Sequence, residues 1–280
     1  MSSNILVIGG TGKTGRRVVE KLQKLEQNVR VGSRNAQPAF DWQNQSTWSA
    51  ALEGIDKVYI TFQPDLAVPG ALEAIEALVK EAKKQEVKKL VLLSGKGEKE
   101  AQLCEQVVIH SGLDYTIVRA SWFMQNFSES FFLDPILAGH VALPKPEAKV
   151  PYVSTDDIAD VAVAALLDDA HNGNIYELTG PETLTFEEIV SEIAKASGRQ
   201  IQFTPITQSA YIKMLEEFGV PADYIWLINY LFSEVLDAEG NNIISNDIEK
   251  VLKRKPISFK EYVQETVRTG VWNPKTSELA

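Results

Sequence analysis

Apolar and polar positions alternate in blocks over the first 120 residues of the chain. Short segments rich in apolar residues predict strands at NILVIGG, NVRVGSR, KVYITFQ, KKLVLLSG and DYTIVRA. NILVIGG and KKLVLLSG are nearly continuous apolar runs, as expected of buried strands, whereas NVRVGSR alternates. The stretches between them carry apolar residues at helical spacing, which predicts helices over residues 16–24, 69–85 and 98–111. Strands that alternate with helices pair into parallel sheets through right-handed crossovers. The pattern therefore predicts an α/β fold, a Rossmann-type doubly wound parallel sheet with helices on both faces.

The pattern changes after residue 120. The segment SWFMQNFSESFF is dense in aromatic residues, and LPKPEAKVP is a proline-rich connection. A further helix is expected over 156–167, and two more over about 209–235 with a break at GVP. Two capping boxes, TFEE from Thr185 and SFKE from Ser258, predict that helices begin there.

These patterns suggest two regions. We expect residues 1–155 to form the Rossmann domain, with 156–180 returning to it. Residues 181–280 are expected to form a smaller, mostly helical substrate or lid region, joined to the first through 120–151.

The turn after the first strand is rich in glycine. It reads GGTGKTG and is followed by an amphipathic helix, which is the arrangement of a dinucleotide-binding corner. We expect Gly9 to permit the tight turn, Gly12 to let the backbone approach a pyrophosphate, and Gly15 to allow close helix packing. Thr11, Lys13 and Thr14 lie between these glycines and are candidate phosphate contacts.

Two other interpretations of the turn are available. The first is a plain strand–helix turn with no bound ligand. The second is a P-loop, which the Gly-Lys-Thr at residues 12–14 suggests. A P-loop requires glycine at position 7, where Val7 stands within the strand, so that interpretation fails.

The end of the second strand indicates which dinucleotide is bound. NAD-binding chains usually carry an acidic residue there for the ribose 2′-hydroxyl. This chain has VGSRN instead, with Ser33 and Arg34 and no acid. Arg34 and Lys13 are suited to a 2′-phosphate, so we expect NADP(H), unless Arg34 is an ordinary solvated side chain.

Composition excludes several classes of function. The formal net charge is −10 and the pI about 5.0, which disfavours nucleic-acid and membrane binding. The single cysteine, Cys104, permits no internal disulfide, and the three histidines are too far apart in sequence to suggest a metal site. No signal peptide is visible, so we expect a cytoplasmic monomer or homodimer that acts on a small-molecule substrate.

Several segments together resemble a known family. ILVIGGTGKTGRRV, GSRN, DLAVPGA, LVLLSGKGEKEAQLCEQ, SGLDYTIVRASWFMQNFSE and YELTGPETLTFEEI are similar to the NmrA-like branch of atypical short-chain dehydrogenases/reductases, nearest to bacterial relatives of ergot-alkaloid dehydrogenases. The resemblance implies a Rossmann core, an NADP(H) site and a substrate cleft under the C-terminal region. It also implies that Phe62, Gln63 and Pro64 lie along the cofactor, with Ser94, Gly95 and Lys96 towards the nicotinamide.

The usual catalytic pair of short-chain dehydrogenases is missing. None of the eight tyrosines has a lysine four residues later. Tyr115 and Arg119 come closest, but in a strand they would stand about 13 Å apart, four rises of ~3.3 Å. Either hydride passes to an acceptor that needs little acid catalysis, or Lys96 or Ser94 supplies a proton. The alternative roles are an ordinary solvated side chain for Lys96 and a hydrogen bond to nearby backbone groups for Ser94.

The aromatic segment after residue 120 is the candidate substrate region. We expect Trp122, Phe123 and Asn126 to contact substrate, although aromatic residues at this spacing also form cores. Glu100 and Glu105 are expected to be exposed helix positions, and Cys104 a small buried one. The leading hypothesis is an NADPH-dependent oxidoreductase that acts on a small, apolar, electron-poor acceptor. The alternative is a non-catalytic NADP(H)-sensing regulator that binds a protein partner.

Overall fold

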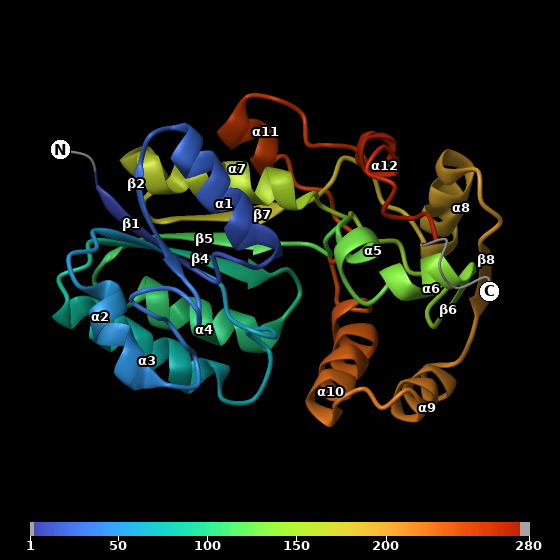
Figure 1. Ribbon diagram of the computed structural model, residues 1–280, viewed down its shortest axis with the longest axis horizontal. Coiled ribbons are helices and arrows are strands. Elements are labelled where there is room, and N and C mark those ends of the chain that lie inside the picture. The colour runs from blue at the N-terminus through green and yellow to red at the C-terminus, as the bar shows by residue number, and fades with distance from the viewer. Residues whose placement is uncertain (1–2, 275–280) are drawn as a thin grey trace. The chain divides into compact units, whose positions relative to one another are not determined.

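The computed structural model describes residues 3–274 and divides the chain into two compact units (Figure 1). Within the described residues, the sheet unit comprises 3–120, 155–178 and 245–255, and the helical unit comprises 121–154, 179–244 and 256–274. The expected boundaries differ from this division in two places. Residues 121–154 pack within the helical unit instead of serving as a connection, and 245–255 return to the sheet unit.

The sheet unit is built on six parallel strands in the order β2-β1-β3-β4-β5-β7. The strands are β1 (Asn4–Ile8), β2 (Asn28–Gly32), β3 (Lys57–Ile60), β4 (Lys89–Gly95), β5 (Asp114–Ala120) and β7 (Asn174–Leu178). The central strands are buried on both faces, which is why their sequences are continuous apolar runs. The predicted Rossmann-type sheet is confirmed.

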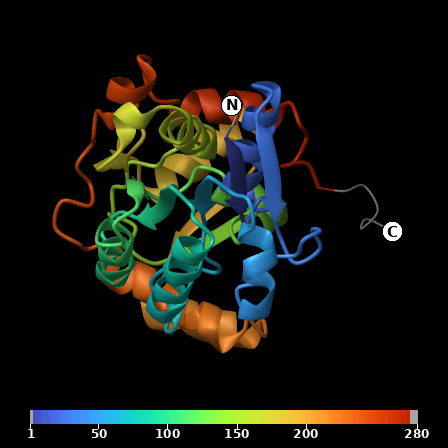
Figure 2. The same cartoon turned by 90° about the vertical axis from the view of Figure 1, so that its left-hand side faces the viewer.

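Helices cover both faces of this sheet (Figures 1 and 2). One layer contains α1 (Lys13–Lys24), α7 (Thr155–Leu167) and α11 (Asp247–Leu252), and the other contains α2 (Trp48–Leu52), α3 (Ala71–Lys84) and α4 (Lys99–Ile109). Two short 3₁₀ turns, Gln45–Thr47 and Asp169–His171, complete the unit. The three expected helices in the first 120 residues are confirmed, with boundaries shifted by one to three residues.

Ion pairs hold residues 245–255 against the sheet unit. Arg254 lies 2.6 Å from both Asp157 and Asp160 of α7. Asp160 also pairs with Lys21 of α1 at 2.6 Å. Because the Asp157 side chain is fully buried, its charge requires the Arg254 partner.

The helical unit has an aromatic core and a two-stranded parallel sheet, β6 (His140–Leu143) with β8 (Gln202–Pro205). Its helices are α5 (Asn126–Glu129), α6 (Leu133–Ala138), α8 (Phe186–Ser197), α9 (Gln208–Glu217), α10 (Ala222–Tyr230), a π-helix (Leu231–Val235) and α12 (Phe259–Val267). Both predicted capping boxes are present, at the starts of α8 and α12. The expected break between two helices falls between α9 and α10.

Candidate functional site

The glycine-rich turn has the geometry that its sequence predicts. Gly9 has a φ of +71°, which only glycine adopts readily, and a Cβ there would stand 2.0 Å from Oγ1 of Thr61. A Cβ on Gly15 would stand 2.2 Å from the carbonyl oxygen of Gly9, so helix α1 packs directly on the turn. The amides of Gly9 and Gly10 both donate to the carbonyl of Gly32, at 2.9 and 3.3 Å, which ties the turn to the end of β2.

The N-terminus of α1 follows this turn. Gly12 is the N-cap, and the first helical hydrogen bond runs from the amide of Arg16 to its carbonyl at 3.1 Å. The amides of residues 13–15 precede that bond and have no partner within the helix. The first turn of α1 carries no acidic side chain that would compete for them. The start of α1, with the positive end of the helix dipole, has the geometry that suits an anion.

Arg34 lies at the end of β2, immediately beyond Gly32 and Ser33. Its side chain is exposed and has no hydrogen-bond or ion-pair partner among residues 3–274. The carbonyl of Ser33 accepts hydrogen bonds from the amides of Ala36 and Phe40, at 3.2 and 2.9 Å, so the chain curls back and leaves Arg34 at the tip. Arg17 differs from Arg34, because Asp156 binds its Nε at 3.2 Å.

The segment after β3 lies beside the glycine turn. Nε2 of Gln63 would be 3.8 Å from a Cβ on Gly12. Phe62 packs on Trp42 with ring centroids 4.7 Å apart, and the indole of Trp42 donates to the carbonyl of Thr61 at 3.1 Å. Trp42 was not among the predicted site residues, since its loop shows no periodic pattern. The sequence carried one usable signal, an aromatic residue shortly after the second strand.

A row of polar side chains crosses the carboxyl ends of β4, β5 and β7. The strand register pairs Ser94 with Arg119, and Arg119 with Glu177, so all three point to the same face of the sheet. On that face lies Glu105 of α4, which accepts hydrogen bonds from Ser94 Oγ at 2.6 Å and from Arg119 Nε at 3.0 Å. Arg119 also donates to Glu177 at 3.2 Å. The expectation that Glu105 is exposed was wrong, because its side chain is fully buried against these donors.

Lys96 joins the same row. Its amide donates to the carbonyl of Ala120 at 2.8 Å, which extends the β4–β5 pairing by one residue. Its Nζ lies 3.1 Å from Oε2 of Glu177, and only 7% of the side chain is exposed. Lys96 is therefore not a solvated lysine in a flexible loop. Ser94 is likewise buried and donates to Glu105, not to backbone.

A second pair of carboxyl groups lies beside Gly95. The Glu98 side chain folds back over this glycine, where a Cβ would stand 2.1 Å from its carboxyl carbon. Burial raises the pKa of Glu98 well above its usual value, and the nearby charge of Asp65 raises it further. Burial also raises the pKa of Asp65, which accepts hydrogen bonds from the Ala67 amide and from Glu98. Both carboxyl groups of the pair are thus shifted towards their protonated forms, Glu98 the more strongly.

The three predicted substrate residues belong to the helical unit. Trp122 is 9% exposed and meets Phe232 of the π-helix edge-on, with ring centroids 5.5 Å apart. Asn126 begins α5 and is 8% exposed, and Phe123 forms an isolated parallel β-bridge with Val153. Trp122 is therefore part of the aromatic core of this unit. Exposed aromatic surface lies instead on α10, where Trp226 is 43% exposed.

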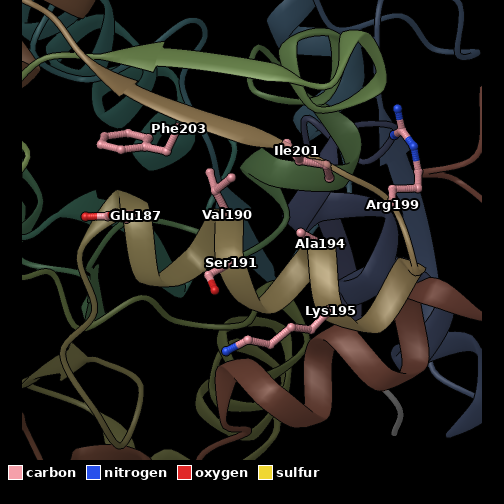
Figure 3. A pocket seen from close by; sticks show the side chains of 8 residues that line it. All are labelled: Glu187, Val190, Ser191, Ala194, Lys195, Arg199, Ile201 and Phe203. Carbon is pink, nitrogen blue, oxygen red and sulfur yellow. The ribbon is translucent and has the colours of Figure 1, made fainter.

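A separate hollow lies between α8 and β8 of the helical unit (Figure 3). Its volume is about 400 Å³, and it is lined by Glu187, Val190, Ser191, Ala194, Lys195, Arg199, Ile201 and Phe203. The guanidinium of Arg199 donates hydrogen bonds to the carbonyls of Ile136, Leu137 and Trp272, at 2.7–2.9 Å. The hollow contains none of the predicted site residues. Within the described part of the chain, no cluster of side chains is arranged to hold a metal ion, and no helix is long and apolar enough to cross a membrane.

Curated relatives cover nearly the whole chain. A NAD(P)H azoreductase from Xenophilus azovorans is 30% identical over 282 residues, covering 93% of this chain and 96% of that protein. An agroclavine dehydrogenase from Claviceps fusiformis is 28% identical over 286 residues, with coverage of 96% and 98%. Prestalk A differentiation protein A from Dictyostelium discoideum is 31% identical over 280 residues, with coverage of 94% and 92%.

Solved structures share the fold. A Citrobacter triphenylmethane reductase complexed with NADP(H) aligns with a TM-score of 0.80 at 18% identity, covering 94% of this chain and 100% of that one. An NADPH-dependent quinone oxidoreductase from Escherichia coli, complexed with NADPH, aligns with a TM-score of 0.75 at 21% identity, with coverage of 94% and 99%. The NmrA-like family model matches residues 1–263, which include the glycine turn, the polar row and most of the helical unit. The resemblance suggested by the sequence motifs is confirmed: this chain belongs to the NmrA-like family.

Proposed function

We propose that the chain binds NADP(H) at the glycine turn and uses it to reduce a small, electron-poor organic acceptor. The observation that carries the proposal is Arg34 at the tip of β2, which has no hydrogen-bond or ion-pair partner within residues 3–274 and follows the strand that is tied to the glycine turn before α1. An acidic residue at that position would repel a 2′-phosphate, whereas a guanidinium binds one with two hydrogen bonds. The NADP(H) complexes of two proteins with the same fold support this choice.

The names of relatives support reductive chemistry. They include an azoreductase, a dehydrogenase of an alkaloid and, at the level of fold, a quinone oxidoreductase. Bound NADPH supplies hydride, and the protein has to orient the acceptor and exclude competing reactions. Because the chain has no Tyr-x-x-x-Lys pair, acceptors that are already electrophilic fit best, of the quinone, iminium or activated carbonyl type.

A second function is a cofactor-dependent regulator. One observation favours it: the α9–α10 region exposes large aromatic and apolar side chains, with Phe218 at 78% and Trp226 at 43%. Surfaces of this kind often bind proteins. The relative from Dictyostelium is named for differentiation and not for a reaction.

Two measurements test the proposal. Titration by calorimetry should give tighter binding of NADPH than of NADH, and Arg34→Ala should weaken NADPH binding at least tenfold while changing NADH binding little. Arg268→Ala, which removes an exposed arginine of the helical unit, is the matched control and should change neither. Equal loss of both cofactors in the Arg34 variant would remove the argument for a 2′-phosphate.

The reaction itself is tested by following NADPH absorbance with quinones, iminium ions, azo compounds and aldehydes. Turnover of at least one class supports the enzyme. NADPH binding without any turnover, together with cofactor-dependent capture of a protein partner, would favour the regulator.

A further inference from the structure

We propose that Lys96 donates the proton that accompanies hydride transfer to a neutral acceptor, and that Glu177 and Arg119 are positioning residues for it. The inference rests on the proposed function and assigns the acid that the missing tyrosine–lysine pair leaves open. It is drawn from the polar row at the carboxyl ends of β4, β5 and β7, which is the edge of an open parallel sheet where ligands bind.

The position of Lys96 is fixed at both ends. At the backbone, its amide is bonded to Ala120 at 2.8 Å. At the tip, Nζ meets Oε2 of Glu177 at 3.1 Å, while the other carboxylate oxygen of Glu177 accepts a hydrogen bond from Arg119 at 3.2 Å. A lysine held in this way loses little conformational freedom when an acceptor arrives, which is the condition for efficient proton transfer.

The charges of the row balance in a way that suits proton donation. Two cations, Lys96 and Arg119, face two carboxylates, Glu105 and Glu177. The hydrogen bonding of Arg119 to the Glu105 carboxylate, which accepts, is the main cause of the raised pKa of Arg119, so this guanidinium stays charged. When Lys96 gives up its proton, Glu177 therefore keeps one cationic partner and is not left as an isolated anion.

The chemistry is balanced without another reactant. With a quinone, hydride adds to the acceptor to give a hydroquinone monoanion, and a proton from Nζ of Lys96 completes the hydroquinone. Lys96 becomes a neutral amine and recovers its proton from water, which reaches the pair through the Glu177 side, where 37% of the side chain is exposed. With a cationic acceptor, hydride alone gives a neutral product, and no proton is needed.

This difference between acceptors provides the test. Lys96→Arg keeps the positive charge and the ion pair, but a guanidinium does not release its proton. We expect this variant to bind NADPH normally and to reduce a naphthoquinone 10²–10⁴-fold more slowly, mainly in kcat, as loss of a general acid requires. Reduction of a triarylmethane dye cation should change less than about threefold, because no proton is transferred to it.

Two further variants separate positioning from proton transfer. Lys96→Ala should regain quinone turnover when ethylamine is added, which a purely structural defect would not do. Glu177→Gln should lower quinone kcat without affecting the dye, and Glu177→Asp should restore part of it. The control is Lys99→Met, an exposed lysine three residues away, which should behave as wild type. Thermal unfolding of each variant checks that it folds.

The outcomes distinguish this inference from the proposed function. Equal loss for both acceptors, no rescue by amine, or a wild type that reduces only the cation would overturn the role of Lys96 and leave the reductase assignment intact. A wild type that binds NADPH but reduces neither acceptor, nor any other in the panel, would overturn both.

Discussion

Replacing Glu98 by glutamine removes an ionisable group from the interior of the sheet unit without removing its hydrogen bond. Glu98 is 7% exposed and caps α4 with its carboxyl folded over Gly95. Its pKa in the folded protein is raised well above its usual value, first by burial and then by the nearby charge of Asp65. An amide has the same shape as the protonated acid, is neutral at every pH, and its N–H can donate to Asp65.

The sign of the effect follows from proton linkage. A raised folded pKa means that the native state binds a proton that the unfolded chain has already lost. The stability that Glu98 contributes is therefore complete below pH 4.5 and is lost as the pH rises through its folded pKa. One proton changes the free energy of unfolding by about 1.4 kcal/mol per pH unit. Between pH 5 and 7 the Glu98→Gln variant should gain up to about 3 kcal/mol relative to wild type.

The assay is urea unfolding at pH 5, 6, 7 and 8, followed by tryptophan fluorescence. The exposed Glu76→Gln on α3 is the control and should stay within about 0.5 kcal/mol of wild type. Glu98→Ala removes the hydrogen bond to Asp65 and should cost about 1–3 kcal/mol at pH 5. If the stability curves of wild type and Glu98→Gln run parallel from pH 5 to 8, Glu98 is ionised in the native protein and the reasoning fails.

Three other changes probe the fold around the site. Gly15→Ala places a Cβ 2.2 Å from the Gly9 carbonyl oxygen, so it should lower Tm and abolish the increase in Tm that NADPH causes. Gly12→Ala places its Cβ 3.2 Å from the same atom and should lower Tm less. Burial raises the pKa of Cys104 to about 12, so an aromatic disulfide reagent should not react with it at pH 8 until urea unfolds the chain. Arg254→Ala leaves the buried Asp157 without its cation and should cost about 3 kcal/mol in urea unfolding, and adding Asp157→Asn should recover part of that.

The sequence predicted those features that depend on residues close together in the chain. The glycine turn was identifiable because Gly9 and Gly15 occupy places where a side chain would clash with backbone or with Thr61. Both capping boxes were identifiable because the two partners are three residues apart. Strands β1, β3 and β4 were identifiable because burial on both faces leaves an unbroken apolar run, whereas the edge strand β2 was identifiable from its alternating sequence.

Features that depend on pairing between distant segments were not predicted. Strand β6 pairs with β8, with His140 opposite Gln202. Its four residues are too few to show a strand pattern in the sequence, and a proline-rich segment follows them. The return of 245–255 depends on Arg254 meeting α7, nearly 100 residues earlier. The polar row was missed for the same reason, since the register that aligns Ser94, Arg119 and Glu177 exists only in the folded sheet.

Two buried acidic residues that follow β4, Glu98 and Glu105, differ because their neighbours differ. Glu105 accepts hydrogen bonds from Ser94 Oγ at 2.6 Å and from the guanidinium Nε of Arg119 at 3.0 Å. Glu98 faces another carboxyl, and two such groups fit together in a buried space only with a proton between them. Lys96 precedes both of these acids in sequence, and its own carboxylate partner, Glu177, comes from β7. The turn after β4 thus places a cation that pairs with Glu177 of β7 two residues before a buried acid whose pKa is raised.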